Sequence, residues 1–371
     1  MWKTGLFPTQ LVGSWVKPRW VADHSKVYAK EGTWWSIPEA ERSEALDDVA
    51  RLSIYDQNRA GITFATDGEA RRQTFSGHFY QLGGIDQDNP AEFTNFHNDI
   101  TEYLTMKRKA TNVGADLEDT ETPKESPKVL FPAVREKIHW PGPLVLDELK
   151  FLKRYAAERT KITVIGPVTL SYRLVDQGIY ADQASLCFAI ADALNEELRA
   201  LAAEGVDIIQ IDEPEVHFRY SQCQDFTVDA INRMVRGVDC LTQVHVCYGY
   251  SKNIDLKEPS PIYPKAVELI SETKVDAIHT EYAQPGHTPD FLQSVGGKLA
   301  AVGVLNLDPD GEVEEVDSII RSVEGMLEVL PPERISLAPD CGMWFLDRTF
   351  AAAKLRSMCL AAQALANRYE R

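Results

Sequence analysis

Two residues whose types and spacing could bind a metal lie in one short apolar run. The stretch 242–249 (TQVHVCYG) contains His245 and Cys247. Side chains two residues apart in a β-strand point to the same face, so the imidazole and the thiol would project together. A neutral imidazole beside a thiolate suits a borderline-soft ion such as Zn²⁺. Two ligands do not complete a site, so the prediction depends on what other segments supply.

The elements that must position these residues follow a regular alternation. Eight segments with strand character end near Ser14, Glu69, Thr169, Glu215, Cys247, Glu281, Leu307 and Cys341. Most are followed by a segment with helical periodicity, and nearly all carry polar residues at their C-terminal ends. This pattern predicts an α/β protein of the TIM (β/α)8 barrel class, whose active sites lie at the C-terminal ends of the strands. A doubly wound open sheet is the alternative fold.

We expect residues 1–371 to form a single catalytic domain, because one large barrel accommodates 371 residues. Between about residues 71 and 161 the periodicity loosens, and aromatic and polar residues mix. The apolar content of this stretch is thin for an independent core. We therefore interpret residues 71–161 as an insertion after the second strand, packed on the barrel.

Charge and composition exclude several classes of function. The net charge of -17 argues against nucleic acid and anionic membrane surfaces as partners, because both require a basic footprint. No apolar run reaches the roughly 18 residues of a membrane span, and the N-terminal residues lack the apolar core of a signal peptide. The six cysteines show no disulfide framework, which favours reduced thiols and a cytoplasmic protein. No glycine-rich phosphate loop of a standard type is present.

On the predicted barrel, further ligands converge with the first two. His245 and Cys247 end the fifth strand, Glu281 the sixth and Cys341 the eighth. Two thiolates, an imidazole and a carboxylate would form a tetrahedral Zn²⁺ site. The carboxylate, as the least committed ligand, could exchange for an incoming thiol. Because a free thiol with a pKa of about 8.5 is mostly protonated at neutral pH, metal coordination would hold such a substrate as its thiolate.

Each candidate ligand also has a structural interpretation. Cys247 alone would be a small packed side chain, and Glu281 alone an ordinary salt bridge at the barrel mouth. Their combination on three strands favours the metal site. His279 shares the face of Glu281 and is interpreted as a partner of a ligand, a substitute ligand or a packed residue. The remaining cysteines are interpreted as packed side chains: Cys187, Cys223, Cys240 and Cys359.

Six short motifs occur in the order seen in one known enzyme family. They are GSW at 13–15, DGEARR at 67–72, GPVT at 166–169, IDEP at 211–214, HVCYG at 245–249 and PDCG at 339–342. Over nearly its whole length the chain resembles the catalytic barrel of the cobalamin-independent methionine synthases, and most closely their short, single-barrel members. The order HxC, then Glu, then PDCG is a specific combination.

The resemblance implies a zinc-dependent thiol S-methyltransferase of methionine biosynthesis. The metal would bind the thiol of homocysteine, which then attacks an electrophilic methyl group. The implied Zn²⁺ ligands are His245, Cys247, Glu281 and Cys341.

The resemblance also implies how the amino-acid part of homocysteine is bound. Ser14 would receive its carboxylate, and Glu69 and Asp212 its ammonium. Two carboxylates that face a cation favour an amino-acid thiol over a sulfonate thiol. The alternative role of Glu69 and Asp212 is an ion-pair network with Arg71 or Arg72.

The methyl donor stays open because the chain departs from the two-barrel enzymes at two points. It has no N-terminal half of the kind that helps hold a polyglutamylated folate. In GVLNLDPD (303–310), Asp308 stands where that family has a His thought to protonate the folate leaving group. An Asp with an ordinary pKa near 4 is a poor acid at neutral pH unless burial raises it. Asp308 is nevertheless the candidate catalytic acid. Methyltetrahydrofolate and a methylcorrinoid, free or on a corrinoid protein, both remain as donors.

Two other functions are compatible with the same residues. A zinc thiol alkyltransferase that resembles the epoxide:coenzyme M transferases would need a basic, sulfonate-binding pocket, against which the retained acids argue. A non-catalytic zinc-binding protein would have a closed metal site with no response to thiols.

Overall fold

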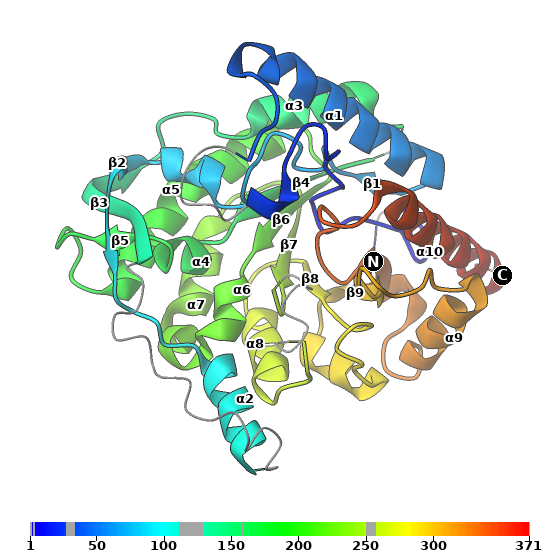
Figure 1. Ribbon diagram of the computed structural model, residues 1–371. Helices are drawn as coiled ribbons and strands as arrows, with labels where there is room; N and C mark the ends of the chain where they lie inside the picture. The colour runs from blue at the N-terminus through cyan, green and yellow to red at the C-terminus, as the bar shows by residue number, and fades with distance from the viewer. Residues whose placement is uncertain are drawn as a thin grey trace.

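A parallel sheet of seven strands forms the centre of the molecule. The protein's structure, a computed structural model, describes residues 2, 4–26, 34–110, 129–157, 159–249 and 257–370. Within them the strand order is β1-β4-β6-β7-β8-β9-β10. The bounds are β1 (Phe64–Ala65), β4 (Arg159–Ile165), β6 (Ile208–Asp212), β7 (Leu241–Val246), β8 (Ala277–Thr280), β9 (Leu299–Leu305) and β10 (Ile335–Pro339). Figure 1 shows these strands inside a surrounding layer of helices.

The sheet curls until both of its edge strands contact one N-terminal segment. Thr9 forms a parallel bridge with Leu337 of β10, and Gln10 forms one with Phe64 of β1. The amide of Gln10 donates to Leu337 O at 3.0 Å, and the amide of Phe64 donates to Thr9 O at 2.9 Å. The first predicted strand therefore contributes isolated bridges and not a regular ladder. The result is a mixed α/β fold with a curled parallel sheet, consistent with a TIM-like barrel.

The longer helices alternate with these strands, as the sequence periodicity predicts, whereas Thr169 and Glu215, where two predicted strands end, lie in short helices. Long and short together, these helices are α1 (Glu39–Ala60), α3 (Leu146–Tyr155), α4 (Pro167–Ser171), α5 (Gln183–Ala203), α6 (Pro214–Phe218), α7 (Tyr220–Met234), α8 (Ile262–Ser271), α9 (Val316–Met326) and α10 (Arg348–Tyr369). Local signals set their ends. Asp182 and Ser185 form a capping box at α5, and Gly61, with φ 83°, ends α1. None of the helices in the described ranges is long and apolar enough to cross a bilayer.

A second, three-stranded sheet lies at the edge of the molecule, on the left of Figure 1. It consists of β2 (Gly83–Phe93), β3 (Val129–His139) and β5 (Val175–Asp176), and α2 (Asp99–Ala110) follows β2. β2 pairs with β3 in the antiparallel direction, whereas β3 and β5 are parallel. The segment after β3 is attached to the main body. The Trp140 indole and the Leu144 and Val145 amides all donate to the carboxylate of Glu197 in α5.

The interior of the curled sheet contains a buried polar network. Lys161 on β4 donates to Gln10 Oε1 at 2.7 Å, and the Gln243 amide donates to Gln10 and to Gln210. Gln210 in turn donates to Asp212 Oδ1 at 2.7 Å. Burial lowers the pKa of Lys161 to about 7. The network satisfies polar groups that would otherwise be costly to bury, and it reaches a predicted site residue at the strand end.

Trp2 covers the opposite end of the sheet, where the strands begin. It is 1% exposed and packs in a cluster with Phe64, Ile208, Ala277 and Ala301. Its indole nitrogen donates to Arg334 O at 3.1 Å. Trp2 thus contributes both apolar burial and a satisfied indole N–H to this end of the sheet.

We predict that Trp2→Ala lowers the free energy of unfolding by about 3–5 kcal/mol, because the substitution leaves a cavity beneath the strands. Chemical denaturation followed by circular dichroism measures the change. Trp20, which is 58% exposed, gives the matched control. We expect Trp20→Ala to change stability by no more than about 0.5 kcal/mol. Equal effects of the two substitutions would contradict the packing role of Trp2.

A candidate metal centre and substrate cavity

A cavity of about 680 Å³ lies at the carboxyl ends of the strands and collects most of the predicted site residues. Those that line it are Ser14, Glu69, Asp212, His245, Cys247 and Cys341. Glu281 and Asp308 are not among its lining residues. Another cavity, of about 750 Å³, lies where strands such as β7 and β9 begin, and it contains none of the predicted residues. The cavity at the carboxyl ends of the strands is therefore the candidate functional site.

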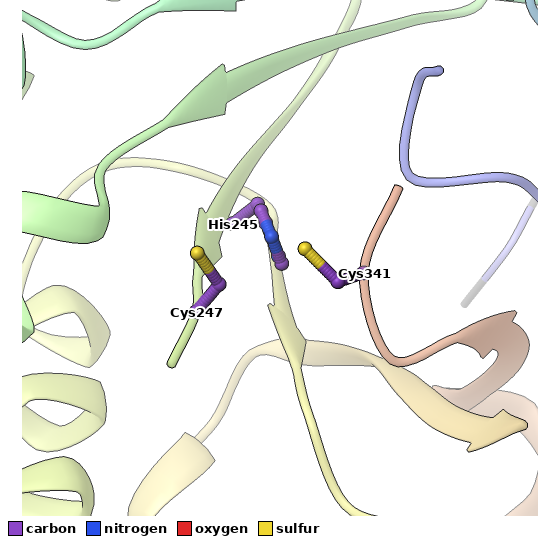
Figure 2. Close-up of side chains that lie close together, drawn as sticks. All are labelled: His245, Cys247 and Cys341. Carbon is purple, nitrogen blue, oxygen red and sulfur yellow. The ribbon is translucent and has the colours of Figure 1, made fainter. Parts of the chain in front are cut away.

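Three potential metal ligands converge in this cavity. His245 and Cys247 come from the end of β7, and Cys341 projects toward them from the segment after β10 (Figure 2). One donor atom from each lies within 4.8 Å of the others, and all three residues are buried. Metal–ligand bonds of about 2.0–2.3 Å bring donors somewhat closer than this, so small side-chain rotations would complete the site. An imidazole and two thiols in this arrangement fit a metal ion.

The protonation of these residues depends on their burial. A hydrogen bond with the neighbouring Cys341 thiol, together with burial, raises the pKa of Cys247 well above its ordinary value. Burial and the adjacent His279 lower the pKa of His245 well below its ordinary value. The imidazole is therefore neutral, as metal binding requires, whereas the thiol needs a nearby cation to lose its proton.

His279 determines which nitrogen of His245 is available to a metal. The Nδ1 atoms of the two rings lie 2.6 Å apart, and His279 Nε2 lies 3.0 Å from Pro339 O. A carbonyl only accepts, so His279 Nε2 carries the proton and its Nδ1 accepts from His245 Nδ1–H. Burial lowers the pKa of His279 to about 3, so its ring is neutral. Nε2 of His245 therefore carries no proton, and its lone pair can coordinate a metal. This geometry favours the interpretation of His279 as the partner of a ligand.

The carboxylate of Glu281 lies at the end of β8 but is already bound by other groups. Lys257 Nζ donates to Oε2 at 2.6 Å, and the Tyr248 amide donates to Oε1 at 2.8 Å. Both Glu281 and Lys257 are buried, and burial raises the pKa of Glu281 to about 7. The predicted fourth ligand is thus absent from the cluster of His245, Cys247 and Cys341. No sequence spacing pointed to Lys257.

Two motif acids hold strand ends together without lining the cavity. Asp340 of PDCG accepts from the amides of residues 282–284, at 2.9, 3.1 and 2.5 Å. A Cβ at Gly303 would lie 1.9 Å from Asp340 Oδ1, so only glycine allows this approach. Glu213 of IDEP accepts from the amides of Val168 and Thr169 and from the Thr169 hydroxyl. The spacing of these two acids in the sequence does not indicate this role.

The backbone directs the carboxylate of Glu69 toward the strand ends. Glu69 has φ 52°, in the left-handed region that non-glycine residues rarely occupy, and follows Gly68 with φ 73°. A Cβ at Gly13 would lie 2.4 Å from Glu69 Oε1, and Thr163 Oγ1 donates to the same oxygen at 2.7 Å. Gly13 is therefore required by the carboxylate that packs against it. This contact brings the GSW and DGEARR motifs together.

Asp212 is the second carboxylate in the cavity. Burial and the nearby charge of Glu69 raise the pKa of Asp212 to about 8. Its Oδ1 accepts from Gln210. Two buried acids that repel each other are stabilised as carboxylates only when a cation lies between or beside them.

The predicted alternative of an arginine network applies to only one of these acids. Arg72 lies 3.8 Å from Glu69 and donates to Glu148 at 2.8 Å. Arg71 instead pairs with Asp47. Among the ion pairs of the described residues, Asp212 has no arginine partner.

Asp308 lies in the loop after β9 and is partly exposed. Its amide donates to Asn306 Oδ1 at 2.8 Å, and its carboxylate accepts from the Asp310 amide at 3.0 Å. The side chain thus stabilises its own turn and does not line the cavity.

The rest of the cavity wall is lined by residues outside the predicted site. Residues 72–76 and 130–132 line it, the latter on β3, so part of the expected insertion contributes to the cavity wall. Other aromatic or cationic lining residues are Lys17, Trp34, Tyr80, Arg173, Phe218 and Trp344. Aromatic and cationic side chains carry no spacing signature, so only the fold could bring them together.

Comparison with known proteins agrees with this description. A family model described as Cobalamin-independent synthase, Catalytic domain, matches residues 94–364. A methionine synthase from Sulfolobus acidocaldarius is 27% identical over 95% of this chain and 90% of its own length, and one from Pyrococcus furiosus is 28% identical over 99% and 95%. A B12-independent methionine synthase from Shewanella sp. W3-18-1, solved in complex with selenomethionine, superposes with a TM-score of 0.81 at 25% identity and covers 98% of each chain.

The curled parallel sheet, with its cavity at the carboxyl ends of the strands, is that of an α/β enzyme. Because the family model spans well over half of the chain, the protein belongs to the cobalamin-independent methionine synthase family, whose enzymes are methyltransferases.

We predict that His279→Leu weakens metal binding at the His–Cys–Cys cluster by about 10- to 100-fold, because the ring of His245 loses the acceptor that orients it. His279→Gln should retain most of the affinity, since an amide can accept from His245 and donate to Pro339 O. Competition with a chromophoric chelator measures the affinity. Thermal unfolding of the metal-free variants controls for misfolding. A well-folded Leu variant with unchanged affinity would show that His279 is only packed.

Proposed function

We propose that the protein is a zinc-dependent methyltransferase that transfers a methyl group to the thiol of homocysteine and so forms methionine. One observation carries this proposal: a buried His–Cys–Cys cluster and two buried carboxylates line the same cavity. A metal held by the cluster would bind a thiol, and the two carboxylates would bind an ammonium. Homocysteine carries both groups. The names of the relatives and the selenomethionine complex of the Shewanella protein support the same substrate.

We also propose the finer architecture, a single TIM (β/α)8 barrel domain over residues 1–371 with an insertion at about residues 71–161. The bridges from Thr9 and Gln10 to both edge strands support an eighth barrel position. The position of β2, α2 and β3 between β1 and β4 supports the insertion.

In the proposed reaction, His245, Cys247 and Cys341 would hold the metal. Bound Zn²⁺ would lower the pKa of a substrate thiol, so that the thiol is a nucleophile at neutral pH. His245 offers Nε2 because its Nδ1 donates to His279. Glu281 remains the proposed exchangeable fourth ligand. While Lys257 and the Tyr248 amide bind its carboxylate, the fourth position would be left to the substrate thiol.

We assign the amino-acid end of the substrate to the polar residues that line the same cavity. Glu69 and Asp212 would bind the ammonium, and the Ser14 hydroxyl would bind the carboxylate. Burial makes both acids effective, because an ion pair is stronger away from water than on a surface. A sulfonate thiol without an ammonium would leave the two acids uncompensated, which disfavours coenzyme M as the substrate.

The donor is proposed to be methyltetrahydrofolate or a methylcorrinoid, free or on a corrinoid protein. The aromatic residues Phe75, Tyr80 and Phe131, which line the cavity, could pack against either planar group. Asp308 as the acid for the folate leaving group stays a prediction, and its place outside the cavity lining favours the corrinoid, which needs no proton.

A methyl-donor screen tests the proposed function directly. The zinc-loaded enzyme is incubated with homocysteine and either methyltetrahydrofolate or methylcobalamin, and methionine is quantified by mass spectrometry. We expect methionine with at least one donor. Alkylation of coenzyme M by an epoxide, with no methionine formed, would instead identify a different thiol alkyltransferase. No turnover and no spectroscopic response of the bound metal to homocysteine would favour a non-catalytic zinc protein.

The metal assignment predicts which cysteines are needed for zinc. The purified protein should carry stoichiometric zinc, and Cys247→Ser and Cys341→Ser should lose it, because a hydroxyl is a far weaker zinc ligand than a thiolate. Cys187→Ser and Cys359→Ser, at buried cysteines on α5 and α10, should keep it. Elemental analysis by mass spectrometry makes the comparison. A wild-type protein that folds without zinc and gains none on addition would refute the metal site.

The raised pKa of Asp212 predicts that ligand binding depends on pH. Binding of an ammonium favours the ionised carboxylate, so Asp212 must release its proton, and affinity rises as pH increases toward about 8. Below that pH, we expect L-methionine affinity to fall by up to about tenfold per pH unit. L-Methionine is the suitable probe because it has no thiol to titrate.

Calorimetry in buffers of different ionisation enthalpy would detect the released proton. Asp212→Asn should bind L-methionine more weakly and with a flat profile below about pH 8, where wild-type affinity still rises. Asp239→Asn, which lies at the opposite end of the strands, is the matched control and should retain the wild-type profile. A flat wild-type profile would contradict the assignment of Asp212 to the ammonium.

A further inference from the structure

Lys17 is a buried cation on the wall of the substrate cavity. It is 3% exposed and lies three residues after Ser14, on the same segment. Hydrogen bonds fix the Ser14–Trp15 peptide at the start of this segment, and His24 Nε2 lies 2.8 Å from Lys17 O at its end. The Trp15 amide donates to Gly68 O at 3.0 Å, and the Met343 amide donates to Ser14 O at 3.1 Å. The position of Lys17 relative to the GSW motif is therefore set by the fold.

The ammonium of Lys17 has no anionic partner within the part of the chain that the structure describes. None of the ion pairs or side-chain hydrogen bonds there involves its Nζ atom, which lies 5.5 Å from the centre of the Trp34 ring. Burial lowers the pKa of Lys17 to about 8, while the charges of Glu69 and Asp67 oppose this shift. The group is thus still mainly a cation at neutral pH. A buried cation without a hydrogen-bonded partner is costly, so its retention points to an anionic ligand.

The other cations of the cavity wall are already engaged. Arg72 donates to Glu148 and Thr163, and Arg173 pairs with Glu215. Lys17 is the remaining side-chain cation on this wall among the described residues. The anionic groups of the same cavity, Glu69 and Asp212, would attract an ammonium. One cavity thus presents a cation and a pair of anions, the complement of a zwitterionic α-amino acid.

We propose that Lys17, together with Ser14, binds the carboxylate of the amino-acid substrate and makes the enzyme selective for α-amino acids over amines. The inference rests on the proposed function, since it assigns a further residue to the same substrate. Lys17 is a specificity-determining residue in this assignment and takes no part in methyl transfer. Ser14 alone supplies a neutral hydroxyl, whereas the ammonium supplies the opposite charge that a buried carboxylate requires.

The test compares two ligands that differ only in the carboxylate. L-Methionine and its decarboxylated analogue, 3-(methylthio)propylamine, are titrated into the zinc-loaded enzyme by calorimetry. The wild type should bind L-methionine about 10- to 100-fold more tightly than the amine, the effect of one charge-assisted interaction in a buried site. Lys17→Met should weaken L-methionine by this factor and leave the amine unchanged, so that the two ligands bind alike.

Two further variants show whether the charge itself is responsible. Lys17→Arg keeps the charge and should restore at least part of the preference for L-methionine. Arg19→Met removes an exposed cation from the same segment, outside the cavity lining, and should leave both affinities at the wild-type values. Equal losses in Lys17→Met and Arg19→Met would indicate a long-range charge effect and overturn the proposal.

The remaining outcomes separate this inference from the proposed function. If the wild type binds L-methionine and Lys17→Met binds it equally well, the assignment of Lys17 is wrong and the methyltransferase proposal is unaffected. If Lys17→Met instead raises the KM for the methyl donor alone, the ammonium serves the donor, and this inference is again overturned. If the wild type binds neither ligand and forms no methionine, both proposals fail.

Discussion

The buried carboxylate of Asp340 fixes the relative positions of three strand ends, and the arrangement of the candidate site depends on this constraint. It accepts from three successive amides after β8 and packs against Gly303 of β9, while its own backbone continues β10. Cys341 is the next residue, so its thiol is placed by the same hydrogen bonds. The Ala283 amide also donates to Gly303 O of β9 at 3.2 Å. For the amides of Tyr282 and Gln284, the carboxylate supplies the acceptor that a buried backbone N–H requires.

A second buried carboxylate acts in the same way at the ends of β4 and β6. Glu213 binds the amides of Val168 and Thr169 after β4, close to Gly166, where a Cβ would lie 2.0 Å from the Glu213 carboxylate. Carboxylates thus accept from amides that lack a backbone partner, at Asp340 beyond the end of a strand and at Glu213 in the first turn of α4. The motifs of this family therefore combine residues that face the cavity with neighbours that hold those residues in place.

The charge balance of the cavity differs from that of the whole chain. The protein carries a net charge of -17, yet its cavity wall includes Lys17, Arg72 and Arg173. Burial raises the pKa of Asp212 and lowers that of Lys17, because it destabilises the charged form of each group. A ligand group of opposite charge would stabilise that form. Two residues of the metal cluster are likewise uncharged while they are buried without a cation. Neutral His245 and protonated Cys247 become effective ligands when a cation enters.

The sequence determined the alternation of strands and helices, the convergence of His245, Cys247 and Cys341, and the family. These features follow from periodicity and from residues that directly end a strand, because parallel strands of one sheet place their carboxyl ends at one edge. The tertiary structure decided which neighbours each group contacts. Lys257 binds Glu281 from a separate loop, and Lys17 lies on the cavity wall with no anionic partner among the described residues. Such contacts depend on side-chain distances between segments remote in sequence, which no local pattern records.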